Sequence, residues 1–111
     1  EEGGGRKNEV FIGLIQLIEK YYMQERGVEL YADKLCLSPK YLSAVSKSIC
    51  GYTVQELVFK AIIRKSISLL KNTQQDIQEI SNAFGFPNAS YFGTFFKKQV
   101  GMSPQQYRKS L

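Results

Sequence analysis

The sequence predicts an all-α protein, with two similar helix-turn-helix lobes joined by a long linking helix and about seven helices in all. Apolar residues recur with the period of a helix, and no stretch alternates with period two. Helix caps and residues that end helices divide the chain into helical segments joined by short connections. The second half also repeats the pattern of the first. A chain of 111 residues is long enough for one domain or two small lobes.

The N-terminal third is predicted to hold a tail and two helices. Residues 1–7 begin acidic and Gly-rich, so we expect a disordered tail or a cloning remnant there. A helix of about 8–25 follows, and Gly27 is expected to end it. A short helix of about 28–35 comes next. The apolar stripes of these two helices include Val10, Leu14, Ile18, Tyr31, Ala32 and Leu35.

Capping residues mark the starts of the later helices. Ser38 and Asn88 are placed as N-caps, and Pro39 suits a first helical position. Thr53 and Glu56 form a capping box that opens the long helix. The expected later helices are 39–50, 53–72, 77–84 (with Asp76 before it), 89–99 and 104–110. The chain is thus divided into a first lobe (8–52), the linking helix (53–72) and a second lobe (73–111).

The repeat has an offset of 50 residues after the turn of each lobe and 49 before it. Tyr41-Leu42 corresponds to Tyr91-Phe92, and Lys47 to Lys97. One inserted residue in the second turn explains the change of offset. Each unit has a short helix, a tight turn and a second helix, which is the helix-turn-helix arrangement. Two copies in register are far more specific than one.

Composition restricts the chemistry that the chain can perform. It contains no His, which excludes a His base, relay or metal ligand. A Gly-rich phosphate loop and a paired set of acids are also lacking, so an enzyme is disfavoured and no cofactor or metal is expected. Cys36 and Cys50 cannot complete a zinc site and are expected to be reduced thiols without a bridge, in a cytoplasmic protein. The apolar stretches are too short for a membrane span.

Positive charge is concentrated in the middle of the chain. Residues 34–71 hold seven basic residues and one acidic residue, whereas residues 1–33 hold four and seven. The net charge of +5 and the pI near 9.3 allow a polyanionic partner such as nucleic acid. A solvated, Lys-rich surface produces the same pattern, so charge alone does not decide between the two.

The motifs of both units resemble the DNA-binding domain of AraC-type transcription regulators. The second unit carries Ile77-Gln78-Glu79-Ile80-Ser81, Gly85-Phe86, Ser90-Tyr91-Phe92, Phe95-Phe96-Lys97-Lys98, Gly101, Ser103-Pro104 and Tyr107-Arg108 in the order and spacing of that family. The first unit matches at residues 31–35, 37–42, Lys47 and Gly51, and the resemblance covers about residues 9–110. Cys36 departs from it at a turn position where the family often has Gly. Ser46 stands where the second unit has Phe96, and Ser81 replaces a small Ala.

The resemblance implies sequence-specific binding of double-stranded DNA. The recognition helices 39–50 and 89–99 would enter successive major-groove segments, with bases read by their N-terminal halves. By resemblance, the base-facing residues are Lys40, Ser43, Ala44, Ala89, Ser90, Gly93 and Thr94. The phosphate-facing residues are Ser38, Tyr41, Lys47, Asn88, Tyr91, Lys97 and Lys98. The base-facing set lacks Arg, Asn and Gln, so we expect readout by shape, water and thymine methyl contacts as well as by direct hydrogen bonds.

Several of these residues have a second interpretation. The lysines can belong to an ordinary solvated face, and the serines to plain helix surface. Tyr41 and Tyr91 can contact phosphate or cover their lobes, and covering is the interpretation we prefer. From the helix pattern, Leu42, Val45 and Ile49 are expected to face inward in the first recognition helix, and Phe92, Phe95 and Phe96 in the second.

The resemblance also implies partners beyond DNA. A family member usually carries a sensor or dimerisation domain on the N-terminal side, and RNA polymerase is a further possible partner. No membrane partner is expected, and the isolated domain should be a monomer. The alternative function is a helical protein–protein docking module without DNA binding, whose groove is formed by Tyr and Phe side chains. Strong salt dependence of duplex binding would distinguish DNA binding from docking.

Overall fold

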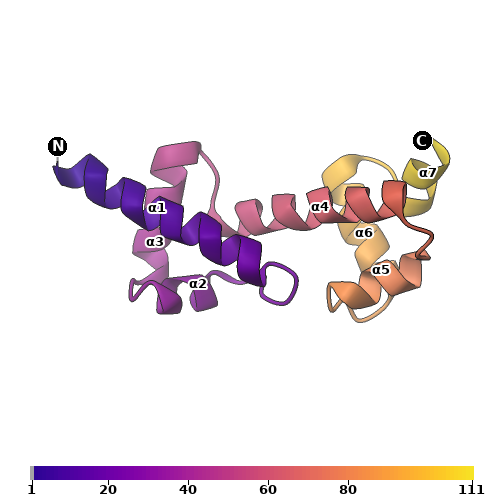
Figure 1. Ribbon diagram of the computed structural model, residues 1–111, viewed down its shortest axis with the longest axis horizontal. Coiled ribbons are helices and arrows are strands. Elements are labelled where there is room, and N and C mark those ends of the chain that lie inside the picture. Colours follow the sequence, from indigo (N-terminus) through magenta and orange to yellow (C-terminus); the bar gives the residue numbers. More distant parts are fainter. Residues whose placement is uncertain (1) are drawn as a thin grey trace. The chain divides into compact units, whose positions relative to one another are not determined.

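The computed structural model describes the backbone of residues 2–111 and the side chains of residues 5–111. This part of the chain forms seven helices and no strand, which confirms the all-α prediction (Figure 1). The helices are α1 (Glu2–Tyr21), α2 (Val28–Lys34), α3 (Pro39–Cys50), α4 (Val54–Asn72), α5 (Ile77–Ala83), α6 (Ala89–Val100) and α7 (Pro104–Lys109). Within the same residues, every helix is too short or too polar to cross a bilayer.

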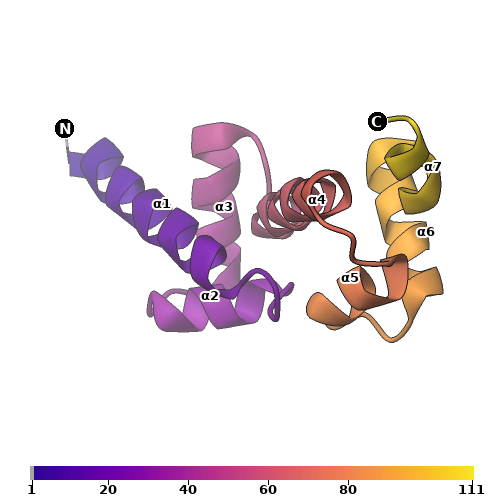
Figure 2. The ribbon, with the colours of Figure 1, turned by 45° about the vertical axis from the view of Figure 1, so that its right-hand side comes forward.

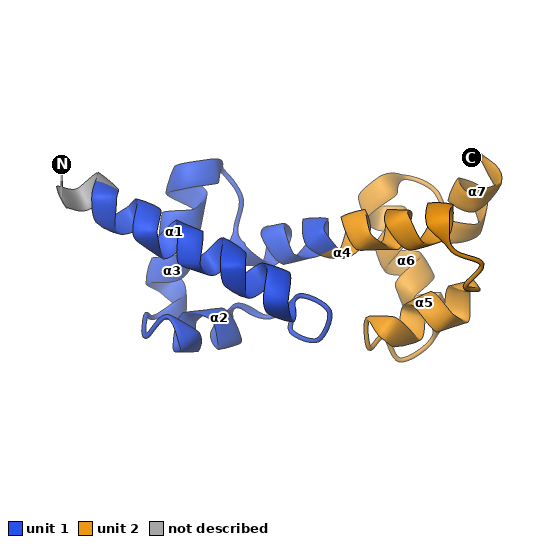
Figure 3. Cartoon of the chain, viewed as in Figure 1, with its two compact units in different colours: residues 1–61 blue, residues 62–111 orange. Residues whose placement is uncertain are grey.

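The chain divides into two compact units, residues 1–61 and residues 62–111 (Figure 3). The boundary lies inside α4, the helix expected as a separate linker. Val54 and Val58 in the first half of α4 are fully buried in the first unit, and Leu70 is buried in the second. Each half of the long helix therefore forms part of the core of one unit.

The start of α1 differs from the prediction. The helix begins at Glu2, so residues 2–7 are helical, where we expected a disordered tail; residue 1 lies outside the described part. Glycine disfavours a helix, and three glycines stand here. However, extending an existing helix costs less than starting one.

The end of α1 also differs, because the helix stops at Tyr21 and not near residue 25. The buried Tyr31 hydroxyl donates a hydrogen bond of 2.7 Å to the carbonyl oxygen of Glu25. A buried hydroxyl needs such a partner, and the segment after Tyr21 supplies it. Gly27 consequently acts as the N-cap residue of α2, and the prediction that it ends α1 is wrong.

The core of the first unit is formed by α1, α2, α3 and the start of α4 (Figure 2). Gly13 lets α1 approach the end of α2 closely, because a Cβ at this position would lie 3.1 Å from Leu35 Cδ2. In α3 the buried residues are Leu42, Val45 and Ser46. Ile49, expected inside, is 37% exposed. Ser46 is fully buried on this face instead, and its hydroxyl donates to the carbonyl oxygen of Tyr52.

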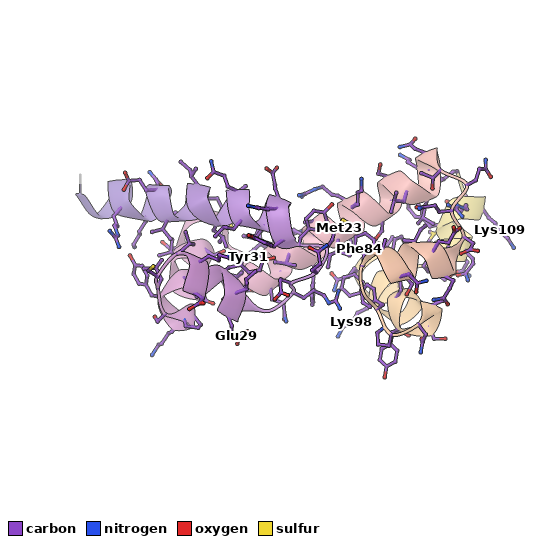
Figure 4. The ribbon with its side chains drawn as sticks, turned by 60° about the horizontal axis from the view of Figure 1, so that its bottom comes forward. Met23, Glu29, Tyr31, Phe84, Lys98 and Lys109 are labelled. Carbon is purple, nitrogen blue, oxygen red and sulfur yellow. The ribbon has the colours of Figure 1, made fainter. Side chains whose placement is uncertain are left out.

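The core of the second unit is aromatic. Phe84 stacks on Phe92 with ring centroids 6.2 Å apart, and Phe96 lies 5.8 Å from both Phe92 and Tyr107. Phe84 is fully buried here, as Tyr31 is in the first unit; both are labelled in Figure 4. Aromatic contacts of this kind therefore hold α5, α6 and α7 together.

Arg108 fastens α7 to the end of α4. Its guanidinium donates hydrogen bonds to four backbone carbonyls, those of Leu69, Leu70, Thr73 and Gln75, at 2.6–3.4 Å. The carbonyls at a helix C-terminus lack partners within the helix and carry partial negative charge. A planar group with several donors satisfies them together.

Candidate nucleic-acid interface

The two helix-turn-helix turns have the same backbone geometry. Cys36 has a φ of 58° in the first turn, and Gly85 has a φ of 72° in the second. The amide of Leu37 donates to Ala32 O at 2.9 Å, and the amide of Phe86 donates to Ser81 O at 3.2 Å. These equivalent bonds confirm the repeat, including the inserted residue between the turn and the second recognition helix. Each recognition helix crosses the preceding short helix steeply (Figure 2).

The N-terminus of each recognition helix is capped as expected. Ser38 Oγ accepts from the amide of Tyr41 at 3.1 Å, and Asn88 Oδ1 accepts from the amide of Tyr91 at 3.0 Å. In the second unit, the buried Ser81 hydroxyl donates to Asn88 O at 2.9 Å. The serine that departs from the family pattern thus ties α5 to the cap of the recognition helix.

The C-terminus of each recognition helix ends on a left-handed glycine. Gly51, with a φ of 82°, donates its amide to Lys47 O, and Gly101, with a φ of 100°, donates to Lys97 O. Both lysine side chains are exposed. The buried Ser46 hydroxyl donates to Tyr52 O at 2.7 Å, which fixes the connection from α3 to α4. Lys47 and Lys97 therefore occupy equivalent positions in the last turns of the two recognition helices.

The predicted base-facing residues lie on one surface strip of each recognition helix, in the N-terminal and central turns. Lys40, Ala44, Ser90 and Thr94 are exposed. Ser43, Ala89 and Gly93 are half-buried. Within each helix they lie together, on the side away from the buried residues.

The predicted phosphate-facing residues are all exposed: Ser38, Tyr41, Lys47, Asn88, Tyr91, Lys97 and Lys98. Tyr91 is 61% exposed and Tyr41 is 38% exposed. The preference for lobe-covering tyrosines is therefore wrong for Tyr91, and Tyr41 covers its lobe only in part. Phe92 and Phe96 fill the second core, which leaves Tyr91 at the surface.

An open hollow in the second unit lies beside its base-facing strip. It is lined by Phe86, Ser90, Tyr91, Thr94 and Phe95. The ring centroids of Phe86 and Phe95 are 5.4 Å apart, and most of the lining is aromatic, with Ser90 and Thr94 adding hydroxyl groups. Sequence reasoning placed Phe95 in the core, but it is only half-buried.

Sequence reasoning used Glu56 only as a capping residue, and its electrostatic surroundings were missed. The Thr53 amide donates to its carboxylate at 2.8 Å and lowers the pKa of Glu56. The charges of Lys47 and Lys60 lower the same pKa further. The sequence held a signal for this site, since Glu56 is the single acidic residue among residues 34–71.

Comparison with known proteins agrees with this geometry. The helix-turn-helix domain family matches residues 31–110. The activator RhaS of Mannheimia succiniciproducens is 31% identical over 97% of this chain, which covers 40% of that protein. The C-terminal domain of AraT, a response regulator from Geobacillus stearothermophilus, is 36% identical, with a TM-score of 0.84 over 92% of this chain and 84% of that one. The DNA-binding domain of AdpA, solved with a target DNA, shares the fold alone, at 19% identity and a TM-score of 0.76 over 88% and 91%.

Fold and site thus define a double helix-turn-helix domain. The chain belongs to the AraC-type helix-turn-helix family, whose members are transcription regulators. It spans between 30% and 46% of the length of the curated relatives compared with it.

Proposed function

We propose that this chain binds double-stranded DNA sequence-specifically as the DNA-binding part of a transcription regulator. The observation that carries the proposal is the equivalence of the two recognition helices. Each presents a strip of mostly small side chains, carries an exposed lysine in its last turn and is closed by a left-handed glycine. Small side chains permit close approach to base edges, while the lysines suit phosphates.

In this proposal α3 and α6 enter successive major-groove segments. The base-facing set is Lys40, Ser43, Ala44, Ala89, Ser90, Gly93 and Thr94. The phosphate-facing set is Ser38, Tyr41, Lys47, Asn88, Tyr91, Lys97 and Lys98. Because the hollow lined by Thr94 is mostly aromatic, it suits a thymine methyl group at a position read by the second unit.

The remaining parts of the function are inferred from the family. We place the chain in the cytoplasm, C-terminal to a sensor or dimerisation domain, with RNA polymerase as a further partner. The relatives' names describe activators and regulators, and the chain itself is not an enzyme in this proposal. Alone, it should sediment as a monomer near 12.6 kDa.

Selection of bound duplexes from a random pool tests the proposal. We expect a motif with two half-elements about one helical turn apart, and affinity that falls steeply with salt. Lys97→Ala should weaken binding on every duplex, whereas Thr94→Ala should act mainly on the selected site. Binding to protein partners with little salt dependence, and none to duplexes, would instead support the docking-module alternative.

A further inference from the structure

The first unit carries a negative charge in a capping box, within electrostatic range of its proposed phosphate-facing lysine. Glu56 belongs to the capping box of α4, in which its carboxylate accepts from the Thr53 amide at 2.8 Å. Its own amide donates to Thr53 Oγ1 at 3.1 Å. The first of these bonds holds the exposed carboxylate at the start of α4, and the second completes the capping box. The carboxylate is thus a fixed part of the surface.

Lys47 lies within electrostatic range of this carboxylate. The amide of Gly51 donates to Lys47 O, and only Tyr52 separates Gly51 from Thr53. The short connection brings the last turn of α3 near the first turn of α4. The charge of Lys47 accordingly helps to lower the pKa of Glu56, behind the larger effect of the Thr53 amide. The second basic neighbour, Lys60, has its ammonium 4.4 Å from the centre of the Tyr52 ring.

The second unit has the same capping box without the charge. Gln106 Oε1 accepts from the Ser103 amide at 3.0 Å, and the Gln106 amide donates to Ser103 Oγ at 3.1 Å. Residues 80–111 contain no Asp or Glu; the acidic residues of the second unit, Asp76 and Glu79, lie in the capping box of α5. Lys98 also stands where the first unit has Ser48, which adds a second exposed cation beside Lys97.

This difference matters for a polyanionic partner. Binding to DNA depends on cations that replace the counterions of the phosphates. A carboxylate near such a cation repels phosphate. It also neutralises part of the positive potential of the cation. Because both groups are exposed and screened by salt, the effect is modest and is largest at low ionic strength.

We propose that Glu56 weakens the contact of the first unit with the DNA backbone, so that the second unit supplies the larger share of phosphate binding. This inference rests on the proposed function. The Glu56 carboxylate reduces the sequence-independent attraction of the first unit to DNA. Base contacts therefore supply a larger share of the binding free energy of that unit.

The test is Glu56→Gln, which keeps the capping box, since Gln106 makes the same bonds in the second unit. Affinity is measured against salt concentration on the selected duplex and on a random duplex. We expect affinity to rise about two- to five-fold on both at low salt, and the salt slope to steepen by up to about one unit. Glu19→Gln is the matched control, because it removes one exposed negative charge from α1, a helix of the same unit that carries none of the proposed DNA-facing residues.

Two further variants make the test independent of any one substitution. Gln106→Glu should weaken binding and flatten the salt slope by a similar amount. Lys47→Ala should cost more affinity in the Glu56→Gln background than in the wild type. If the wild type binds DNA but Glu56→Gln behaves like Glu19→Gln and Gln106→Glu changes nothing, the inference is wrong and the proposed function stands. If the wild type binds no duplex, the proposed function fails, and the inference fails with it.

Discussion

Replacing Cys36 by glycine should stabilise the first unit. Cys36 has a φ of 58°, in the left-handed region, where a non-glycine residue costs roughly 1–2 kcal/mol. Glycine recovers this cost but loses about 0.5–1 kcal/mol through its greater freedom in the unfolded chain. Cys36 is exposed, so little packing is lost. The net expectation for Cys36→Gly is a gain of about 0.5–1 kcal/mol in the free energy of unfolding.

The chain supplies its own matched control at the equivalent position of the second turn. Gly85 has a φ of 72°, and a Cβ added there meets nothing within 4 Å. Gly85→Ala should therefore destabilise the second unit by a similar amount, through backbone strain alone. Urea denaturation followed by circular dichroism measures both variants, and the slope with denaturant should stay constant. A Cys36→Gly variant no more stable than the wild type, at unchanged slope, would refute the strain argument.

Three further predictions concern stability and redox state. Arg108→Lys should lower the unfolding free energy by about 1–3 kcal/mol, because lysine cannot bond the carbonyls of Leu69, Leu70, Thr73 and Gln75 together; a melting temperature equal to the wild type would contradict this. Burial raises the pKa of Tyr31 to about 12 from 10.0. The contribution of the neutral Tyr31 hydroxyl to the free energy of unfolding is therefore complete below pH 10 and is lost as pH rises toward 12. Denaturation from pH 9 to 12 should therefore show a shallower alkaline decline for Tyr31→Phe; an unchanged decline would rule out Tyr31 as its source. Because Cys36 and Cys50 are both free thiols, adding reductant should leave the melting temperature unchanged within a degree or two, and a larger shift would reveal a bridge.

The sequence predicted best those elements whose ends carry local signals. Ser38, Asn88 and the Thr53–Glu56 box are N-terminal signals that act within three residues, and each caps its helix as expected. The segment that follows α1 instead makes a bond between Tyr31 and the Glu25 carbonyl, a contact that no local pattern reveals. Helical periodicity predicts burial of apolar residues, so it could not anticipate that the polar Ser46 would be buried in place of Ile49.

The candidate interface was predicted to a similar extent. The exposure of Lys47 and Lys97 could be predicted from their equivalent positions in the repeat. The environment of Glu56 did not, because it depends on how the α3–α4 connection brings two helix ends together. Tyr91 was misjudged because the phenylalanines around it already fill the core.

The different interiors of the two repeats have a consequence for folding. Tandem copies of one motif risk misassembly, in which a helix of one copy docks onto the partner helices of the other. Here the slot filled by Ser46 in the first copy holds Phe96 in the second, and both are fully buried. An exchanged helix would leave a large void in one interior and overfill the other, and both errors are costly. Divergence inside the repeats thus keeps each recognition helix with its own partners while the chain folds.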